Sequence, residues 1–504
     1  MRNTDISRTI TQFLKQAIQM ELIEPVDEIY IQNRLLDCLN LDEYVELESL
    51  EDIPDLLDSM DEMIDYAIRN GIIENYQYAR DIYEAKIMNL VTPLPSVVNE
   101  EFWKKYEEDK ELATDYFYKL SQKNDYIKTR NIAKNIFFET SSPYGNLEIT
   151  INLSKPEKDP KEIAAMRQNN STNYPKCALC LENEGYKGHS NHAARANHRV
   201  VRMDLQGETY GMQYSPYVYY NEHSIFLNEV HKPMVVDQKA IENLLEIIDI
   251  LPHYFVGSNA DLPIVGGSIL SHDHYQGGCY QFPIEEAKTV EDLNLVEYPN
   301  VKASIVKWPL SIIRLQAKNK EELVETLIHI MDIWEHYSDE EYAIISHTNG
   351  TRHNTITPIA RFNEGMYEMD VVLRNNRTTE EYPDGIFHPH PDVHHIKKEN
   401  IGLIEVMGLA ILPPRLVEEL QQLEDFLLEK KPLSEVAEIH QEWAKELKNE
   451  AQSFNEDTVS DFIKQKVGDK FTRVLEDAGV YKQDEEGIKG FKKFIEELNS
   501  VKIT

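Results

Sequence analysis

The sequence predicts an α+β protein in which antiparallel sheets and packed helices lie between helical N- and C-terminal regions. Two observations support this fold class. Short β-prone runs with alternating polarity occupy the middle of the chain, whereas both ends carry apolar residues at helical spacing. The length of 504 residues exceeds one ordinary domain, so we expect several structural units.

The apolar spacing divides the chain into four regions. Residues 1–90 form an acidic helical region, and the Pro-containing stretch Val91–Ser96 marks its end. Residues 91–300 and 301–415 are the two halves of the α+β part, of which the first carries the candidate chemistry. Residues 416–504 return to helical spacing with dense Glu and Lys. The two helical ends show no catalytic pattern.

Individual elements of the middle regions follow from local patterns. The alternation in Gly145–Leu153 predicts a strand, and Val235–Leu251 has helical spacing. Tyr217–Tyr220 and Ser224–Leu227 are two β-prone runs joined by residues 221–223, which predicts a hairpin.

A related order of elements recurs later in the chain. The run Ser311–Leu315 (SIIRL) precedes a predicted helix over Glu321–Tyr337, and it resembles Ser224–Asn228 (SIFLN), which also precedes a helix. This recurrence indicates two structurally related α+β halves.

Composition and charge exclude several functional classes. The chain has 52 Lys and Arg against 88 Asp and Glu, which gives a formal charge of −36 and disfavours binding to nucleic acid or to an anionic membrane. No apolar run approaches the length of about 20 residues that a membrane helix needs, and the N-terminus lacks a signal-peptide core. Four cysteines in so long a chain do not form a disulfide framework. We therefore expect a cytoplasmic protein.

The most informative stretch is Gly257–Gly278, which ends in HDHYQGG. If Ser271–Gln276 is extended, His272, His274 and Gln276 share one face. Neutral imidazole is a nucleophile, and a glutamine amide can donate to a phosphoryl oxygen without a proton transfer. Preceding glycines let a ligand approach the backbone, and Ser268 adds a hydroxyl. The competing interpretation is a buried histidine pair beside a glycine turn.

A second pattern is the pair Cys177 and Cys180 in Cys-Ala-Leu-Cys. Such a pair is a zinc half-site, a redox pair or two structural thiols. No thioredoxin-like βαβ pattern surrounds it, so zinc is favoured among the functional readings. A tetrahedral site needs two further ligands, for which His231 and His272 are candidates.

Three further stretches carry charge or histidines. A basic cluster between residues 189 and 199 is either a phosphate-binding loop or a solvated loop, and it consists of His189, His192, Arg195, His198 and Arg199. Lys397–Gly402 precedes the strand-like run Leu403–Gly408 and fits a surface turn before a core strand. His388 and His390 form a second His-x-His pattern, but prolines interrupt it and we interpret it as a loop.

Four segments together resemble a known family. They are CALC, QYSPYVYYNEH, PHYFVGSNADLPIVGGSILSHDHYQGG and KKENIGLIEVMGLAILP. Residues 85–420 resemble the type 2 (Gram-positive bacterial) galactose-1-phosphate uridylyltransferases, which are histidine-triad-related transferases. The resemblance implies two histidine-triad-like halves, a homodimer, and exchange of UMP between UDP-glucose and galactose-1-phosphate through a uridylyl-histidine in the Leloir pathway.

The resemblance also implies roles for individual residues. His274 matches the nucleophile, and Gln276 matches the glutamine that supports the transferred phosphoryl group. Ser268 matches the phosphate-contacting serine, with Ser271 as the alternative. The remaining substrate contacts implied are Asn259 to the nucleotide, and Glu405 with Lys397 or Lys398 to the hexose phosphate.

The better-known type 1 branch of the family binds zinc through two cysteines and two histidines. The matching positions here are Cys177, Cys180, His231 and His272, with His223 as the competitor of His231. This chain departs from type 1 in two places. Asp273 replaces a proline between the two histidines, which implies a different local backbone. Tyr367–Asn376 lacks the histidines of the second, iron-type metal site, so we expect that site to be absent.

Two other functions remain open at this point. A hydrolase of the same superfamily would use the same covalent step and pass the nucleotide to water. A non-catalytic, zinc-containing nucleotide-binding scaffold would bind without turnover. The acceptor of the nucleotide separates the first from a transferase, and the absence of turnover identifies the second.

Overall fold

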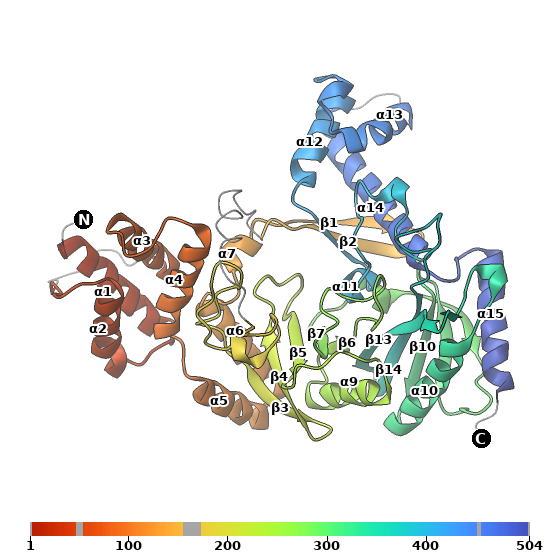
Figure 1. Ribbon diagram of the computed structural model, residues 1–504, viewed down its shortest axis with the longest axis horizontal. Helices are drawn as coiled ribbons and strands as arrows, with labels where there is room; N and C mark the ends of the chain where they lie inside the picture. Colours follow the sequence, from red (N-terminus) through yellow and green to blue (C-terminus); the bar gives the residue numbers. More distant parts are fainter. Residues whose placement is uncertain (1–2, 47–53, 155–172, 451–454, 502–504) are drawn as a thin grey trace. The chain divides into compact units, whose positions relative to one another are not determined.

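The computed structural model describes residues 3–46, 54–154, 173–450 and 455–501 (Figure 1). The chain forms two compact units. The first unit comprises Met1–Asn131, Lys155–Val218 and Ser224–Lys232. The second comprises Ile132–Ser154, Tyr219–His223 and Pro233–Thr504.

The first unit begins with helices, as the apolar spacing predicted. They are α1 (Asn3–Gln19), α2 (Glu28–Cys38), α3 (Leu56–Arg69), α4 (Gln77–Leu90), α5 (Pro95–Glu108) and α6 (Lys110–Lys123), followed by the short α7 (Thr129–Ile132) at the unit boundary. In α1 the buried residues Ile6, Ile10 and Phe13 recur at helical spacing. Asp55 begins α3 by accepting a hydrogen bond from the Leu57 backbone N–H at 2.9 Å.

A small antiparallel sheet completes the first unit. Its strands are β3 (Val201–Leu205), β4 (Glu208–Tyr214) and β5 (Ser224–Asn228). Helix α5 packs on β3, where the Trp103 indole donates to the Arg202 carbonyl at 3.1 Å.

Of the hairpin predicted for residues 217–227, only the second strand forms. β5 forms, but its antiparallel partner is β4, and residues 217–220 are not a strand. Pro216 interrupts the backbone, and the His223 N–H closes a turn on the Tyr220 carbonyl at 3.2 Å. The β-prone tyrosines are used for packing instead: the Tyr220 ring contacts Phe282 with 4.9 Å between centroids.

Seven described strands of the second unit form an antiparallel sheet. In spatial order they are β7 (His274–Gly278), β6 (Phe255–Gly257), β13 (Asn354–Asn363), β14 (Met366–Asn375), β10 (Ile312–Ala317), β9 (Lys302–Val306) and β8 (Thr289–Leu293). Helices α9 (Gln238–Ile250) and α10 (Lys320–His336) pack against β13 and against each other (Figure 1). The α+β class with antiparallel sheets is therefore confirmed.

A second sheet and several C-terminal helices contribute to an apolar cluster of this unit. The sheet pairs β1 (Ile136–Ser142) with β2 (Gly145–Ile151), and β15 (Leu409–Leu412) joins β2 in parallel. The C-terminal helices are α12 (Leu416–Leu427), α13 (Gln441–Glu450), α14 (Val459–Ala478) and α15 (Glu485–Ser500). A separate two-stranded hairpin pairs β11 (His347–Thr348) with β12 (Thr351–Arg352). The cluster includes Leu147, Trp308, Leu409 and Phe471.

The prediction of a strand over residues 403–408 is wrong. Leu403–Val406 forms the short helix α11, and the strand β15 begins only at Leu409. Two side chains begin the helix: Asn259 accepts from the Leu403 N–H at 2.9 Å, and Glu405 accepts from the Gly402 N–H at 3.3 Å. These bonds satisfy amide groups that a helix leaves without partners at its start.

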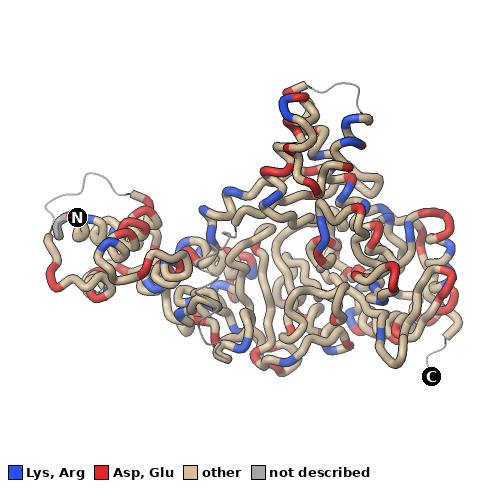
Figure 2. The backbone as a smooth tube through the Cα atoms, turned by 45° about the horizontal axis from the view of Figure 1, so that its top comes forward, with Lys and Arg blue, Asp and Glu red and all other residues tan. Residues whose placement is uncertain are grey.

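Acidic residues are distributed along helices and loops rather than gathered in one patch (Figure 2). Within the described residues, no helix combines the length and apolar character needed to cross a membrane.

Candidate active site and metal centre

His274 begins strand β7, and its contacts select one tautomer of the neutral imidazole. Its Nδ1 lies 2.7 Å from the His272 carbonyl oxygen, and a carbonyl can only accept, so Nδ1 carries the proton. The lone pair is then on Nε2. Burial lowers the pKa of His274 to about 4, so the imidazole is neutral near pH 7. The arrangement presents an uncharged nucleophilic nitrogen.

Gln276 lies two residues further along β7, so its side chain is on the same face as His274. Tyr275 points to the other face, where its hydroxyl oxygen accepts from the Asn243 side chain of α9 at 3.1 Å. The Gln276 Oε1 lies 3.2 Å from His223 Nε2. The structure thus places His274 and Gln276 on one face of β7. It also brings His223 into contact with Gln276, whereas the sequence suggested His223 only as an alternative zinc ligand.

The segment before β7 is less extended than expected. The strand begins at His274, and residues 271–273 lie outside it. His272 is fully buried, and its backbone carbonyl orients His274. Ser268 and Ser271 are both exposed in the preceding loop, so burial does not distinguish them as phosphate contacts.

Gly267 of this loop and Gly402 before α11 allow a close approach to Asn259. A Cβ on Gly267 would lie 2.7 Å from the Asn259 Nδ2, and a Cβ on Gly402 would lie 3.1 Å from its Oδ1. The buried Asn259 therefore sits between the glycine loop and the start of α11, where its Oδ1 binds the Leu403 N–H. The amide nitrogen faces the glycine loop.

Lys397 and Lys398 occupy different environments. The Lys397 ammonium is buried, with Glu405 at 2.9 Å and the Ile411 carbonyl at 3.1 Å. Burial by itself lowers the pKa of Lys397, but Glu405 outweighs that effect and leaves the pKa above its usual value. Lys398 is exposed, so it is the lysine that can meet a ligand.

Lys398 lines a cleft of about 360 Å³ in the second unit. The other lining residues are Ile264, Pro383, Asp384, His388, Glu399 and Asn400. His388 belongs to the His-Pro-His segment, which is a loop as predicted, and its Nε2 lies 3.3 Å from the Asn400 Oδ1. This second histidine pattern contributes a wall of the cleft.

Three of the four expected metal ligands lie together in the first unit. The Cys177 and Cys180 sulfurs are 3.6 Å apart, and the Cys180 sulfur lies 3.2 Å from the His231 Nδ1. Zinc–sulfur bonds of about 2.3 Å at a tetrahedral angle put two sulfurs about 3.8 Å apart, so the donors fit a zinc ion. The fourth expected ligand, His272, belongs to the second unit and is buried.

The Cys-Ala-Leu-Cys turn is braced from behind. The Asn183 amide donates to the Cys177 and Cys180 carbonyls, each at 2.8 Å, and its Oδ1 lies 2.6 Å from the His192 Nε2. Burial raises the pKa of the Cys180 thiol to about 11, so its deprotonation calls for a nearby cation. Such support is typical of a metal-binding turn.

Residues of the basic cluster at 189–199 have different environments: His198 and Arg199 are buried, and Arg195 lines a cavity. His198 is buried, stacks on Tyr126 with 4.3 Å between ring centroids, and contacts Gln213 at 2.9 Å. Arg199 is also buried and donates to the Pro93 carbonyl at 2.6 Å. Neither residue belongs to a solvated loop.

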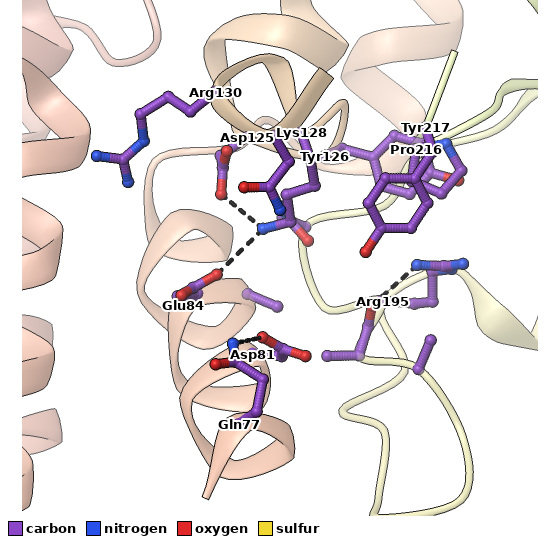
Figure 3. A pocket seen from close by; sticks show the side chains of 15 residues that line it. Gln77, Asp81, Glu84, Asp125, Tyr126, Lys128, Arg130, Arg195, Pro216 and Tyr217 are labelled. Carbon is purple, nitrogen blue, oxygen red and sulfur yellow. Dashed lines mark hydrogen bonds and ion pairs between the residues drawn. The ribbon is translucent and has the colours of Figure 1, made fainter. Parts of the chain in front are cut away.

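Arg195 lines a cavity of about 180 Å³ in the first unit (Figure 3). Lys128 is bound there by Asp125 at 2.6 Å and Glu84 at 3.2 Å. The lining includes three acidic residues, Asp81, Glu84 and Asp125, and three basic residues, Lys128, Arg130 and Arg195. The charges therefore balance, and the cavity lacks the positive excess of a phosphate site.

Strand β14 carries two buried carboxylates, Glu368 and Asp370. Asp370 is fully buried between two guanidinium groups, with Arg314 at 2.6 Å and Arg361 at 2.7 Å. Arg361 also contacts Glu368 at 2.5 Å. Here the arginines supply the positive charge that these buried carboxylates need.

Comparison with known proteins identifies relatives over nearly the whole chain. Two family models match: "Galactose-1-phosphate uridyl transferase, N-terminal domain" over residues 21–233 and the corresponding C-terminal domain over residues 246–445. A galactose-1-phosphate uridylyltransferase of Ligilactobacillus salivarius is 51% identical, covering 97% of this chain and 98% of the relative. One of Lactococcus lactis subsp. lactis is 50% identical, covering 98% and 100%. Among solved structures, yeast Ap4A phosphorylase Apa2 in complex with Ap4A matches with a TM-score of 0.36 and 14% identity, covering 64% of this chain and 91% of that chain.

Replacement of each of the two lysines should have a different effect on stability. Replacing Lys397 by Met removes the cation beside the partly buried Glu405, so we expect the free energy of unfolding to fall by about 3 kcal/mol. The matched change Lys398→Met removes an exposed charge and should leave the unfolding free energy within about 0.5 kcal/mol of the wild type. Urea denaturation followed by circular dichroism measures both. Equal losses in the two variants would contradict the assignment of Lys397 to the buried pair.

Proposed function

This chain belongs to the galactose-1-phosphate uridylyltransferase family, and we propose that it transfers UMP from UDP-glucose to galactose-1-phosphate through a uridylyl-histidine at His274. The observation that carries the proposal is the His274 imidazole, which is neutral and hydrogen-bonded through Nδ1 so that Nε2 is the nucleophile. The reaction belongs to galactose metabolism, and we expect it in the cytoplasm.

The reaction consists of two displacements. In the first, the Nε2 lone pair of His274 bonds to the α-phosphorus of UDP-glucose while the bond to the bridging oxygen breaks, and glucose-1-phosphate leaves with that oxygen. In the second, a phosphate oxygen of galactose-1-phosphate bonds to the same phosphorus, the phosphorus–nitrogen bond breaks, and UDP-galactose forms. The proton on Nδ1 stays with His274 in both steps, bound to the His272 carbonyl.

Other residues bind and position the substrates in this proposal. Gln276 and Ser268, or Ser271 in its place, donate to the non-bridging oxygens of the transferred phosphoryl group. The Asn259 amide nitrogen contacts the nucleotide. Lys398 binds the hexose phosphate, while Lys397 holds Glu405 in place beside the start of α11.

We propose zinc as the bound metal, held by Cys177, Cys180 and His231, with His272 as the fourth ligand. A zinc ion supplies charge and rigidity there. The residues themselves keep the Cys-Ala-Leu-Cys turn in place through Asn183. His223 is the less suitable ligand because its Nε2 is bound to Gln276. We expect no second metal on β14.

Incubation with UDP-glucose alone should separate the transferase from its two rivals. A transferase with a stable uridylyl-enzyme releases glucose-1-phosphate in a burst that stops near one equivalent per chain. His274→Gly removes the nucleophile and should abolish the burst, whereas the control His189→Gly, in a turn of the first unit, should keep it. Release would be followed by a coupled assay, and folding by circular dichroism.

The alternatives predict other results in the same experiment. Continuous release of UMP would identify a hydrolase, and no release from a folded, zinc-containing wild type would favour a binding scaffold. A normal burst in His274→Gly would contradict the proposed nucleophile.

The pH dependence of the burst should report the lowered pKa of His274. The imidazole is the nucleophile only when neutral, so the rate should be flat above about pH 5 and fall as the pH drops through about 4. Unfolding also becomes easier in acid, because the unfolded histidine has a higher pKa than the folded one and binds the proton more readily. Circular dichroism at each pH therefore has to show intact folding. A rate that halves near pH 6.5 in folded protein would contradict the buried, neutral histidine.

Metal analysis should find about one zinc ion per chain. Cys180→Ser removes one thiolate and should lower the zinc content well below one, measured by plasma emission spectrometry after gel filtration. Cys38→Ser is the matched control, since Cys38 is a buried cysteine of α2 outside the ligand group, and it should keep its zinc. Full zinc content in Cys180→Ser would rule out this ligand set.

A further inference from the structure

We propose that His223 is a positioning residue that fixes the orientation of the Gln276 amide, so that its nitrogen rather than its oxygen faces the transferred phosphoryl group. The inference rests on the proposed function and adds a residue to it. His223 comes from the turn before β5, a part of the chain with no recognised role in the sequence beyond a candidate zinc ligand.

The contact between the two side chains determines the amide orientation. The Gln276 Oε1 lies 3.2 Å from the His223 Nε2, and an amide oxygen can only accept, so His223 donates. The amide NH2 group then points away from His223 and is available to a ligand. Without a fixed donor, a glutamine amide can turn over and present its oxygen, which would repel a phosphoryl oxygen.

The protonation of His223 agrees with this role. The His223 Nδ1 is buried and has no hydrogen-bond partner in the described part of the chain, so the acceptor at Nε2 is what fixes the proton there. Burial lowers the pKa of His223 to about 4, which keeps the ring neutral near pH 7. A neutral donor orients the amide without adding a positive charge beside the nucleophile.

Two further hydrogen bonds connect the turn that carries His223 to strand β7 and to the residue that follows it. The Tyr220 hydroxyl donates to the Gly277 carbonyl at 3.2 Å, and the Asn221 amide donates to the Cys279 carbonyl at 3.2 Å. A Cβ on Gly278 would lie 2.8 Å from the Glu222 carbonyl oxygen, so glycine permits this approach. The His223 ring also packs on Tyr220, with 4.5 Å between centroids. These contacts fix the distance between His223 and Gln276.

The test is a double-mutant cycle on the first displacement, measured as the rate constant of glucose-1-phosphate release in a single turnover with UDP-glucose. His223→Leu removes the donor and should lower this rate constant about tenfold, with little change in the UDP-glucose concentration at half-maximal rate. Gln276→Ala removes the phosphoryl donor and should lower it about a hundredfold. Because His223 acts through Gln276, the double variant should be within about twofold of Gln276→Ala.

The second part of the test asks whether a conservative replacement of His223 restores the rate constant. In His223→Gln the side-chain amide can still donate to Gln276, so the rate constant should return to within about threefold of the wild type. His223→Asn keeps a polar group that is too short to reach and should resemble His223→Leu, and it replaces the leucine variant if the latter does not fold. Thermal unfolding of each variant reports on folding.

Several outcomes would overturn the inference. They are an unchanged rate in His223→Leu, a loss in His223→Leu that multiplies fully with that of Gln276→Ala, or a loss that affects only the concentration at half-maximal rate. These outcomes are distinguishable from failure of the proposed function, because the latter would show as a wild-type protein without the burst.

Discussion

The hydrogen bond between the His274 Nδ1–H and the His272 carbonyl is the interaction on which the proposed chemistry of this chain depends. It determines which imidazole nitrogen holds the proton, and burial keeps the other nitrogen uncharged. Because the acceptor is a backbone atom two residues away, the backbone path from His272 to His274 sets the direction of the proposed nucleophile. The surrounding structure can be understood as support for that short segment.

That support comes from contacts on both sides of the strand. Tyr275 binds Asn243 of α9 on one face, and Gln276 contacts His223 on the other. The glycine loop before the strand packs on Asn259, which also begins α11. Close packing around glycines thereby joins the nucleophile segment to the segment that carries the lysines. Precise positioning of this kind is worth several orders of magnitude in rate for a reaction that needs little acid–base assistance.

Much of the fold and of the candidate site follows from the sequence. Alternation and helical spacing located β2, α9, β10 and α10, and period-two spacing placed His274 and Gln276 on one face. Local patterns failed where side chains from distant segments decide the outcome. Leu403–Val406 has the composition of a strand, but the caps from Asn259 and Glu405 make it a helix. The tyrosines at residues 217–220 have β propensity, yet Tyr220 packs in the core, Tyr219 packs partly buried against it, and the pairing is left to β4.

The site residues show the same limit. The sequence suggested two lysines for one role, and only burial separates Lys397, paired with Glu405, from the exposed Lys398. His223 could not be assigned because its partner lies 53 residues away in the chain. The Cys-Ala-Leu-Cys pair left zinc and structural thiols equally open in the sequence, and the structure places the expected ligand His231 with its Nδ1 3.2 Å from the Cys180 sulfur.

The cap that Asn259 provides to α11 spans 144 residues of sequence. Strand β6 ends two residues before Asn259 and pairs with β13, and this pairing shortens the loop that the cap has to close. A chain emerging from the ribosome would have the His274 segment long before the residues that complete its surroundings. The cap of α11 can therefore form only after synthesis has passed Leu403.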